Sequence, residues 1–534
     1  MAVLTGIDVL GVQRYIFSSN RIKDVVAGSY VVHWITSLDG VIAEMVGRGL
    51  MAEKDVLLAG GGNAYIEFPS IEKAKVFAAH YTRALHDRAT GLEVVVVHEP
   101  FKEGDLALAL QKIQITLAKA KTERIPSVPL SGLSVTASCM ETGQPAIAVD
   151  RDDATLPISR NIVNRREKKD EANNYWKQFL GDCAGFDFPL ELDQLGRSEG
   201  DTSQLGVVHI DGNGVGSLIK DWLDKKVQNG TGDEAVRVEY RELSESIDRL
   251  GKDALKAVVD RLSRSIDKGK KVYGEPERLC FGLKKNKKSG NWLLPIRPIL
   301  LGGDDLTFVC DGRIALSLAE AALVVFEKRE ALPHIGQIKA CAGIAIVHVH
   351  SPFARAYELA EKLCRSAKDK SRTTGNGACA LDWHIGMARP AETLHEIRLR
   401  HYQGKKLTCR PYLLGSESDQ NKETWFWFCR MLLDDPTYGL RGEVWSDKHN
   451  KVKTLAEVVR DGADVVKKTI KVWWASDSIH EDDAAFTWSF FKESGGFFDG
   501  SSTPLLDAIE LVDLHLVLEN AVHESTGDQG AEQC

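Results

Sequence analysis

The sequence contains the same succession of elements twice, and this duplication limits the fold more than any other feature. In each copy, a short apolar segment that ends in an aspartate precedes a helical stretch and two apolar runs around a glycine-rich centre. The two aspartates are Asp8 and Asp211. The two centres read Gly60-Gly61-Gly62-Asn63 and Gly302-Gly303-Asp304-Asp305. Apolar runs on both sides of such a short turn predict a β-hairpin.

Further periodicity extends each copy to the order β-α-β-β-α-β. Apolar residues spaced by three or four predict helices, and short apolar runs between turn residues predict strands. In the first copy we expect helices over 25–50 and 71–89 and a strand over 92–97. In the second copy we expect helices over 243–266, 314–327 and 353–367 and strands over 340–348 and 378–383. The sequence therefore predicts an α+β fold with two ferredoxin-like domains.

The rest of the chain is less regular. Between the two copies we expect a helix over 106–121 and a strand over 133–139. The region from about 390 to 523 is helical in pattern, and its tryptophans are typical of core or partner-interface anchors. The polar segment 524–534 predicts disorder. The predicted domain boundaries are 1–140, 141–200, 201–390 and 391–534.

Composition narrows the class of protein. A net charge of −8 disfavours a general nucleic-acid coat but permits local basic patches. Ten cysteines stand singly without a Cys-x-x-Cys pair, which indicates reduced thiols and argues against a zinc ribbon. The N-terminus lacks the pattern of a signal peptide, and no apolar run reaches the roughly 18 residues of a membrane span. We therefore expect a cytoplasmic protein that does not bind membranes.

Three acids are the candidate metal ligands. Asp211 ends a predicted strand, and Asp304 and Asp305 lie in the predicted neighbouring hairpin, so their carboxylates can converge. Mg²⁺ prefers oxygen ligands and often combines one or two carboxylates with substrate phosphates. Two ions about 3.5–4 Å apart can activate a hydroxyl and stabilise a leaving group. The alternative is a plain polar turn, because Gly and Asp are preferred turn residues.

These motifs resemble a known family. The second hairpin with residues 210–213 upstream resembles the Palm domain of the large, polymerase-like subunit of type III CRISPR effectors. Residues 6–21 are similar to the opening segment of that family, and the first hairpin resembles its degenerate first Palm. Residues 342–345, 352, 360–361 and 367–368 resemble the stretch after the acid pair. The resemblance covers roughly residues 1–140 and 200–390.

The resemblance implies an activity and a set of site residues. Such proteins convert ATP into cyclic oligoadenylate messengers in RNA-activated antiviral defence, with two Palms face to face. It implies that Asp211, Asp304 and Asp305 hold two Mg²⁺ or Mn²⁺ ions, with Asp304 and Asp305 as catalytic residues. It further implies partners, namely guide and target RNA and other effector subunits. The implied ATP-binding residues are Gly302, Gly303, Lys368, Gly60, Gly61, Gly62, Asn63, Asn20 and Arg21, with Ser19 beside them.

Two departures from the family pattern bear on activity. Many relatives have a second acid where this chain has Asn213, which brings an amide oxygen but no charge. The first Palm strand begins within a few residues of Met1, so we expect no N-terminal HD nuclease domain and no metal-dependent DNase. The pair His86-Asp87 lies in a helical stretch and is typical of a polar surface.

Two weaker candidates and three function classes stay open. The lysines between 268 and 288 are consistent with an RNA contact, but a solvated loop is the more common explanation. His348 and His350 lack a third metal ligand and favour a structural role. The chain is an oligoadenylate synthase, a catalytically silent two-Palm scaffold of an RNA-guided complex, or a diguanylate-cyclase-like enzyme. Leu306 after the acid pair and the preceding second Palm disfavour the last class.

Overall fold

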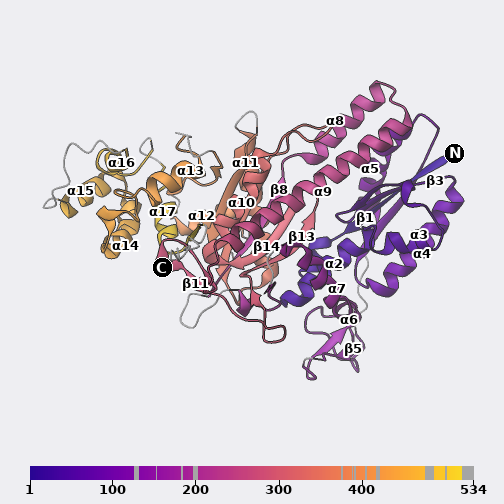
Figure 1. The fold of residues 1–534 in the computed structure, drawn as a ribbon, viewed down its shortest axis with the longest axis horizontal. Helices are drawn as coiled ribbons and strands as arrows, with labels where there is room; N and C mark the ends of the chain where they lie inside the picture. Colours follow the sequence, from indigo (N-terminus) through magenta and orange to yellow (C-terminus); the bar gives the residue numbers. More distant parts are fainter. Residues whose placement is uncertain are drawn as a thin grey trace, which may run out of the picture.

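The computed structural model describes residues 1–125, 132–151, 153–181, 185–195, 203–373, 377–387, 389, 392–402, 406–415, 421–474, 486–498 and 502–519. Three regions follow one another along the long axis of the molecule (Figure 1). An N-terminal sheet domain lies at one end, a larger sheet domain lies in the middle, and a helical region lies at the other end. The predicted α+β fold class is confirmed.

The N-terminal domain contains a four-stranded antiparallel sheet in the order β2-β3-β1-β4. Its strands are β1 (Ala2–Leu10), β2 (Val56–Gly60), β3 (Asn63–Phe68) and β4 (Glu93–Phe101). Its helices are α1 (Val12–Ile16), α2 (Ile22–Thr36), α3 (Val41–Gly47), α4 (Ile71–Arg88) and α5 (Leu106–Glu123). This β-α-β-β-α-β unit is the predicted ferredoxin-like domain.

Two sequence predictions in this part of the chain are wrong. The helix expected over 25–50 is split, because the chain turns between α2 and α3 at Gly40, where a Cβ would lie only 1.8 Å from the Trp34 carbonyl oxygen. The strand expected over 133–139 does not form. Leu133 and Val135 are 73% and 88% exposed, so the apolar run has no sheet to pack on.

The middle domain repeats the arrangement and extends it. Its sheet has the order β13-β14-β8-β15-β16-β17, and the first four strands are antiparallel like those of the N-terminal domain. These strands are β8 (Gln204–Gly212), β13 (Ile296–Gly302), β14 (Asp305–Asp311), β15 (Ala340–His348), β16 (Ala380–Ile385) and β17 (Tyr412–Leu413). Helix α10 (Ala315–Lys328) follows the hairpin, and α11 (Phe353–Arg372) connects β15 to the parallel β16.

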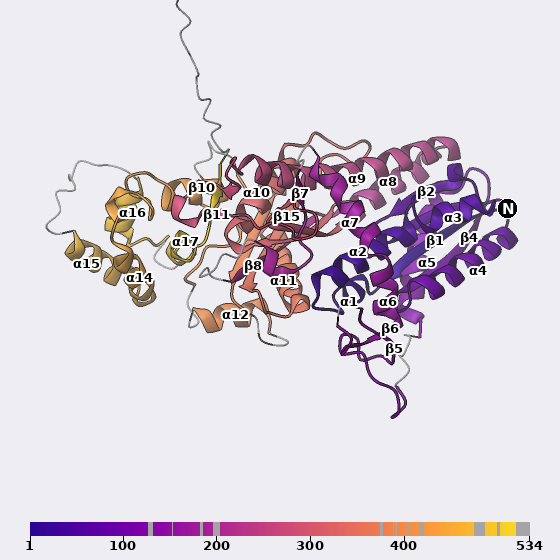
Figure 2. The same cartoon turned by 60° about the horizontal axis from the view of Figure 1, so that its bottom comes forward.

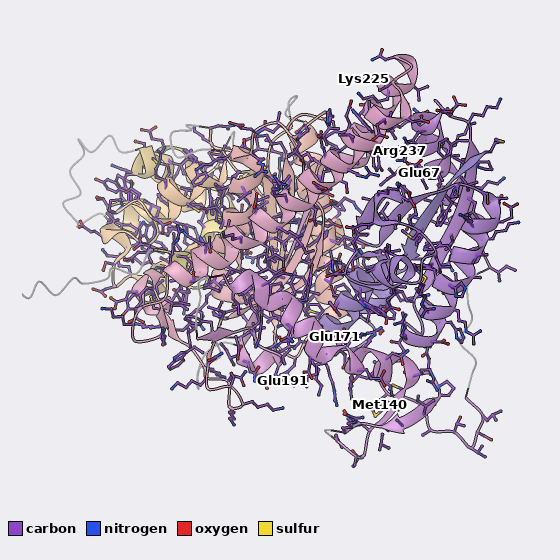
Figure 3. All side chains as sticks on the ribbon, turned by 45° about the vertical axis from the view of Figure 1, so that its right-hand side comes forward. Glu67, Met140, Glu171, Glu191, Lys225 and Arg237 are labelled. Carbon is purple, nitrogen blue, oxygen red and sulfur yellow. The ribbon has the colours of Figure 1, made fainter. Side chains whose placement is uncertain are left out.

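Two helices that precede the second hairpin connect the domains. Helices α8 (Val215–Gln228) and α9 (Asp233–Arg264) run beside both sheets in Figures 1 and 2. Arg237 on α9 forms an ion pair of 2.8 Å with Glu67 on β3, and Figure 3 labels both residues at this junction. The two sheet domains are therefore held together by an element of the second one.

Smaller elements complete the chain. The connecting region contains β5 (Ala146–Val149), β6 (Pro157–Ser159), α6 (Arg160–Glu167) and α7 (Lys169–Lys177). The C-terminal helices are α12 (Leu394–His401), α13 (Trp425–Phe428), α14 (His449–Val458), α15 (Ala463–Trp473), α16 (Phe486–Ser494) and α17 (Leu505–Val512). Most of the tryptophans predicted as anchors are buried here, namely Trp425, Trp427, Trp445, Trp474 and Trp488. The segment 524–534 lies outside the described residues.

Within the described residues, one helical stretch is long and apolar enough to cross a membrane by length and composition. It spans Ile22–Gly47, and 78% of its most apolar window is buried inside the protein. This burial is typical of the core helix of a globular domain.

Candidate active site

The two glycine-rich turns face each other across the domain junction. A Cβ built on Gly302 would lie 3.5 Å from the Gly61 Cα, and one on Gly61 would lie 3.7 Å from the Gly302 Cα. A Cβ at either position would be in ordinary van der Waals contact with the opposite turn, so the two turns lie next to each other. Gly61 also has a φ of 60°, a conformation that favours glycine. The ends of both hairpins therefore form one shared site.

A cavity lies on each side of this contact. The first has a volume of about 180 Å³ and is lined by α1, α2, both turns, Asp305 and Tyr357. The second has a volume of about 220 Å³ and is lined by α8, α9, both turns, Asn63 and Asp304. Because α1 and α2 follow β1 as α8 and α9 follow β8, the two cavities are equivalent under the duplication.

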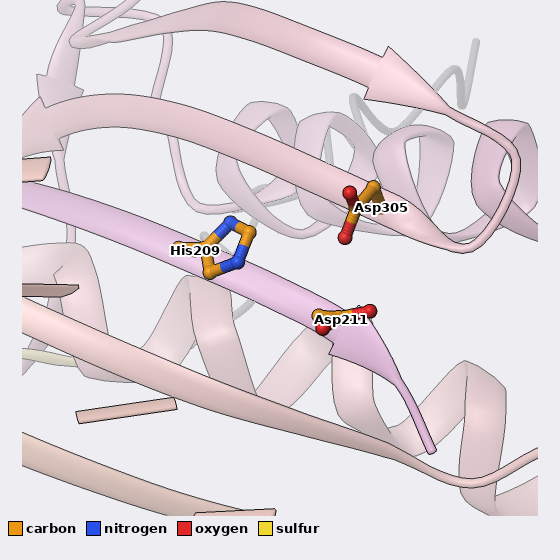
Figure 4. Close-up of side chains that lie close together, drawn as sticks. All are labelled: His209, Asp211 and Asp305. Carbon is orange, nitrogen blue, oxygen red and sulfur yellow. The ribbon is translucent and has the colours of Figure 1, made fainter. Parts of the chain in front are cut away.

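The structure brings two of the three predicted acids together and adds a histidine. Asp211 ends β8, and Asp305 begins the adjacent β14. One ligand atom each from His209, Asp211 and Asp305 lie within 4.8 Å of one another (Figure 4). Asp304 lies beside this group, since a Cβ on Gly212 would be 2.4 Å from the Asp304 Oδ2. All of these residues meet at one end of the β8–β14 strand pair.

The electrostatics of the cluster suit a cation. Burial, and after it the charge of Asp211, raises the pKa of Asp304 to about 6. Burial together with Asp211 and Asp304 raises the pKa of Asp305 well above its usual range. The Asp305 Oδ1 is buried without a hydrogen-bond partner. A divalent ion would neutralise this crowded negative charge and satisfy that oxygen, so the residues present fit Mg²⁺ or Mn²⁺.

Lys368 already contacts the acid cluster. Its Nζ forms an ion pair with Asp211 and donates a hydrogen bond of 2.8 Å to the Gly212 carbonyl. The N-terminal domain has the equivalent pair, in which Lys121 on α5 contacts Asp8 on β1. The contact between a helix lysine and a strand-end aspartate therefore occurs at equivalent positions in both copies.

The side chain of Asn213 contacts helix α11. Its Nδ2 donates a hydrogen bond of 3.1 Å to the Ser371 Oγ on α11, and its Oδ1 is buried without a hydrogen-bond partner.

The opening-segment residues contact other parts of the protein. The Ser19 Oγ donates a hydrogen bond of 3.2 Å to Asp24. The Asn20 Oδ1 accepts a hydrogen bond of 3.3 Å from the Phe353 backbone N–H at the start of α11. Arg21 forms an ion pair of 2.8 Å with Asp150 in the connecting region. The structure thus places these residues at domain contacts, and neither Asn20 nor Arg21 lines the two cavities beside the turns.

Three residues at the site were not singled out from the sequence. His209 precedes Asp211 by two positions, and in a strand this spacing puts both side chains on one face. Tyr357 on α11 lies 5.4 Å from the His209 ring and accepts a hydrogen bond of 3.2 Å from Gln13. The strand alternation was a usable signal for His209, whereas Gln13 and Tyr357 meet only through the tertiary fold.

The weaker candidates lie elsewhere. The lysine-rich segment contains short strands, and its Lys285 lies over the Trp292 ring at 4.7 Å. The His348 and His350 rings are 5.2 Å apart, and no third metal-ligating side chain was found with them among the described residues. His86 is exposed on α4 beside Asp87.

Two ferredoxin-like domains that meet through glycine-rich hairpins, one of them acidic, define a two-Palm protein of the nucleotide-cyclase fold. Residues 204–375 match the family model described as Cas10/Cmr2, second palm domain. The predicted resemblance to the large subunit of type III CRISPR effectors is confirmed by this match over the second Palm.

Solved structures share the fold over nearly the whole chain. Csm1 of T. onnurineus aligns with a TM-score of 0.53 at 13% identity, covering 97% of this chain and 70% of that one. The Csm1–Csm4 cassette in complex with cA3 gives the same values. The cassette in complex with pppApA aligns with a TM-score of 0.53 at 11% identity, covering 97% of this chain and 69% of that one. No curated protein matches the sequence.

Proposed function

We propose that this chain is a nucleotidyltransferase that joins ATP molecules into cyclic oligoadenylate. The observation that carries the proposal is the acid cluster of the second Palm beside the contact between two glycine-rich turns. Support also comes from similar structures, because Csm1–Csm4 cassettes have been solved with cA3 and with pppApA.

In this proposal the second Palm holds the metal. Asp211, Asp304 and Asp305 would bind two Mg²⁺ or Mn²⁺ ions, which lower the pKa of the attacking hydroxyl and neutralise charge on the phosphates. Gly302 and Gly303 leave the nucleotide-facing side of the turn free of side chains, so a phosphate can approach the backbone. Lys368 would exchange its contact with Asp211 for a triphosphate oxygen.

The first Palm would hold the second ATP without metal. Its turn, Gly60-Gly61-Gly62-Asn63, borders both cavities but carries no carboxylate. Asn63 lines the second cavity and supplies an amide that can form hydrogen bonds to a base or ribose. Two nucleotides in the paired cavities would then face each other across the Gly61–Gly302 contact.

We further propose that partner binding activates the chain in the cytoplasm. The similar structures with cA3 and with pppApA contain Csm1 together with Csm4, so we expect another effector subunit to bind this chain. Guide and target RNA are the proposed activators, which would account for small cavities in the chain alone.

The test is an assay of oligoadenylate formation. Purified chain, alone and with its effector subunits, guide and target RNA, is incubated with ATP and Mn²⁺ or Mg²⁺, and products are identified by mass spectrometry. We expect oligoadenylate from the wild type and none from the Asp304→Asn/Asp305→Asn double variant.

Two outcomes would favour other functions. Absence of oligoadenylate under every condition, together with full antiviral activity of the double variant, would establish a scaffold. A dinucleotide made only from GTP would establish a diguanylate-cyclase-like enzyme.

A further inference from the structure

His209 is a buried imidazole next to the acids. It lies on β8 with 5% of its surface exposed. Its Nδ1 is 3.0 Å from the Oγ1 of Thr307, its direct partner on β14, and its ring contacts Tyr357 edge-on. For the Nε2 we find no hydrogen-bond partner within the described part of the chain. The ring is therefore held in one orientation with one nitrogen free for a ligand.

The ligand atoms of this cluster lie close enough together to converge on one ion. Ligand atoms about 2.0–2.3 Å from an ion are themselves separated by about 3–4.5 Å. The ligand atoms of His209, Asp211 and Asp305 lie within 4.8 Å of one another (Figure 4). Independent support comes from the Asp305 Oδ1, which is buried and has no hydrogen-bond partner.

The first Palm has no nitrogen ligand at the position equivalent to His209. Because Asp8 matches Asp211, Gly6 takes the position of His209 on the equivalent strand. A Cβ at Gly6 would lie 3.0 Å from the Ile113 side chain of α5, so the position is closed by apolar packing. Asn63, which pairs with Asp8, replaces Asp305.

We propose that His209 coordinates one of the catalytic ions together with Asp211 and Asp305, and that this mixed nitrogen and oxygen site selects a divalent first-row transition ion such as Mn²⁺ over Mg²⁺. The inference rests on the proposed function for its role in catalysis. Mg²⁺ prefers oxygen ligands and retains its waters, whereas imidazole binds transition ions more tightly, in the order Mn²⁺ < Fe²⁺ < Co²⁺ < Ni²⁺.

The test uses metal binding rather than turnover. Mn²⁺ is added to the full chain, and pulsed electron paramagnetic resonance is used to detect coupling between the ion and a ¹⁴N nucleus. We expect such coupling in the wild type and its replacement by ¹⁵N coupling when histidine is ¹⁵N-labelled. In His209→Gln we expect the coupling to disappear and Mn²⁺ affinity to fall by about 10- to 100-fold, with Mg²⁺ affinity changed less than about threefold.

His98→Gln is the matched control. His98 lies on β4 of the first Palm, and its Nδ1 is 2.9 Å from the Thr5 Oγ1, so it is a threonine-bonded histidine away from the acids. We expect this variant to keep both the coupling and the Mn²⁺ affinity. Thr307→Val provides a second variant, which removes the bond that orients His209 and should weaken Mn²⁺ binding while retaining nitrogen coupling.

Several results would overturn the inference. These are wild-type protein that binds Mn²⁺ without histidine coupling, wild-type protein that does not bind Mn²⁺, or equal losses of Mn²⁺ and Mg²⁺ affinity in His209→Gln. Since the wild-type spectrum needs no variant, a folding failure of His209→Gln leaves the test intact. Histidine coupling in a protein that makes no oligoadenylate would refute the proposed function and leave the metal site in place.

Discussion

The two Palms place an aspartate and a lysine at equivalent positions but surround them differently. Asp8 with Lys121 and Asp211 with Lys368 form the same strand-to-helix ion pair. In the second Palm, three additional ligating groups lie around this pair, whereas the first Palm has glycine, glycine and asparagine there. The pairs are His209 and Gly6, Asp304 and Gly62, and Asp305 and Asn63. The shared aspartate–lysine pair alone therefore does not provide a set of metal ligands, and the second Palm adds the groups that we propose as ligands.

The backbone of the turns reinforces the difference. Gly61 and Gly62 both have positive φ, of 60° and 85°, whereas in the second turn Gly303 has φ 69° and Asp304 is not among the residues with positive φ. An aspartate at position 62 would be strained, because L-residues with a Cβ rarely adopt that region. The backbone conformation of the first turn thus disfavours an aspartate at position 62, where the second turn has Asp304.

The largest expected effect is the difference in oligoadenylate formation between substitutions of Asp211 and of Asp8, the two aspartates at strand ends. We expect Asp211→Asn to lower oligoadenylate formation by on the order of a thousandfold, because it removes a metal ligand. Asp8→Asn should change the rate less than about threefold, because its carboxylate has no acidic partner to share an ion. Rates are measured with saturating ATP and Mn²⁺ in the activated complex. Equal losses in both variants would contradict the division of labour between the Palms.

Substitutions of Lys368 and Lys121 should differ less in their effect on the rate than those of the two aspartates. Lys368→Met should lower the rate by about 10- to 100-fold, since we propose that its ammonium binds the triphosphate. Lys121→Met should lower it by no more than about twofold. A fall in rate of similar size for Lys121→Met would show that both Palms bind a triphosphate through this position.

Competition between protons and Mn²⁺ for carboxylates should appear only at the second Palm. With a pKa of about 6, Asp304 is protonated at pH 5 and ionised at pH 7, so Mn²⁺ affinity should rise with pH across this interval. The rise should approach about tenfold per pH unit below pH 6 and then level off. Calorimetric titration between pH 5 and 7.5 measures it. Asp304→Asn should reduce the slope and leave the contribution of Asp305, whose pKa is also raised by burial, and an unchanged slope in that variant would assign the proton to Asp305 alone.

The smallest effect concerns stability without metal. Asp305→Asn should raise the melting temperature by about 1–3 °C, because it removes a buried carboxylate beside two others. Asn63→Asp should lower it by a similar or smaller amount, since it places a second carboxylate opposite Asp8. Thermal unfolding in EDTA checks both. Stabilisation by the second change would mean that Lys121 neutralises both acids.

Sequence patterns predicted much of this fold because the duplicated units carry strong local signals. Alternating and apolar runs located all the principal strands of both Palms, and helical periodicity located α4, α5, α10 and α11. The failures have a common cause. The break after α2 depends on a close contact between Gly40 and Trp34. The apolar run near Leu133 is exposed and does not pair with the edge of a sheet.

The candidate site was predictable only in part. Asp211, Asp304 and Asp305 were found because acids at strand ends and turns are visible along the chain. Asn20 and Arg21 lie at contacts with Phe353 and Asp150, which no local pattern shows. Tyr357 joins the site through α11, far from the acids in sequence.

By itself the sequence determined that two units with the same strand and helix order exist, and that only one of them has acids in its hairpin. Local periodicity and turn chemistry suffice for such statements, because each concerns residues near one another in the chain. Only the tertiary structure decided that the Gly61 and Gly302 turns touch, that Lys368 contacts Asp211, and that His209 shares a face with two carboxylates. These contacts depend on strand register and domain packing, which join residues hundreds of positions apart.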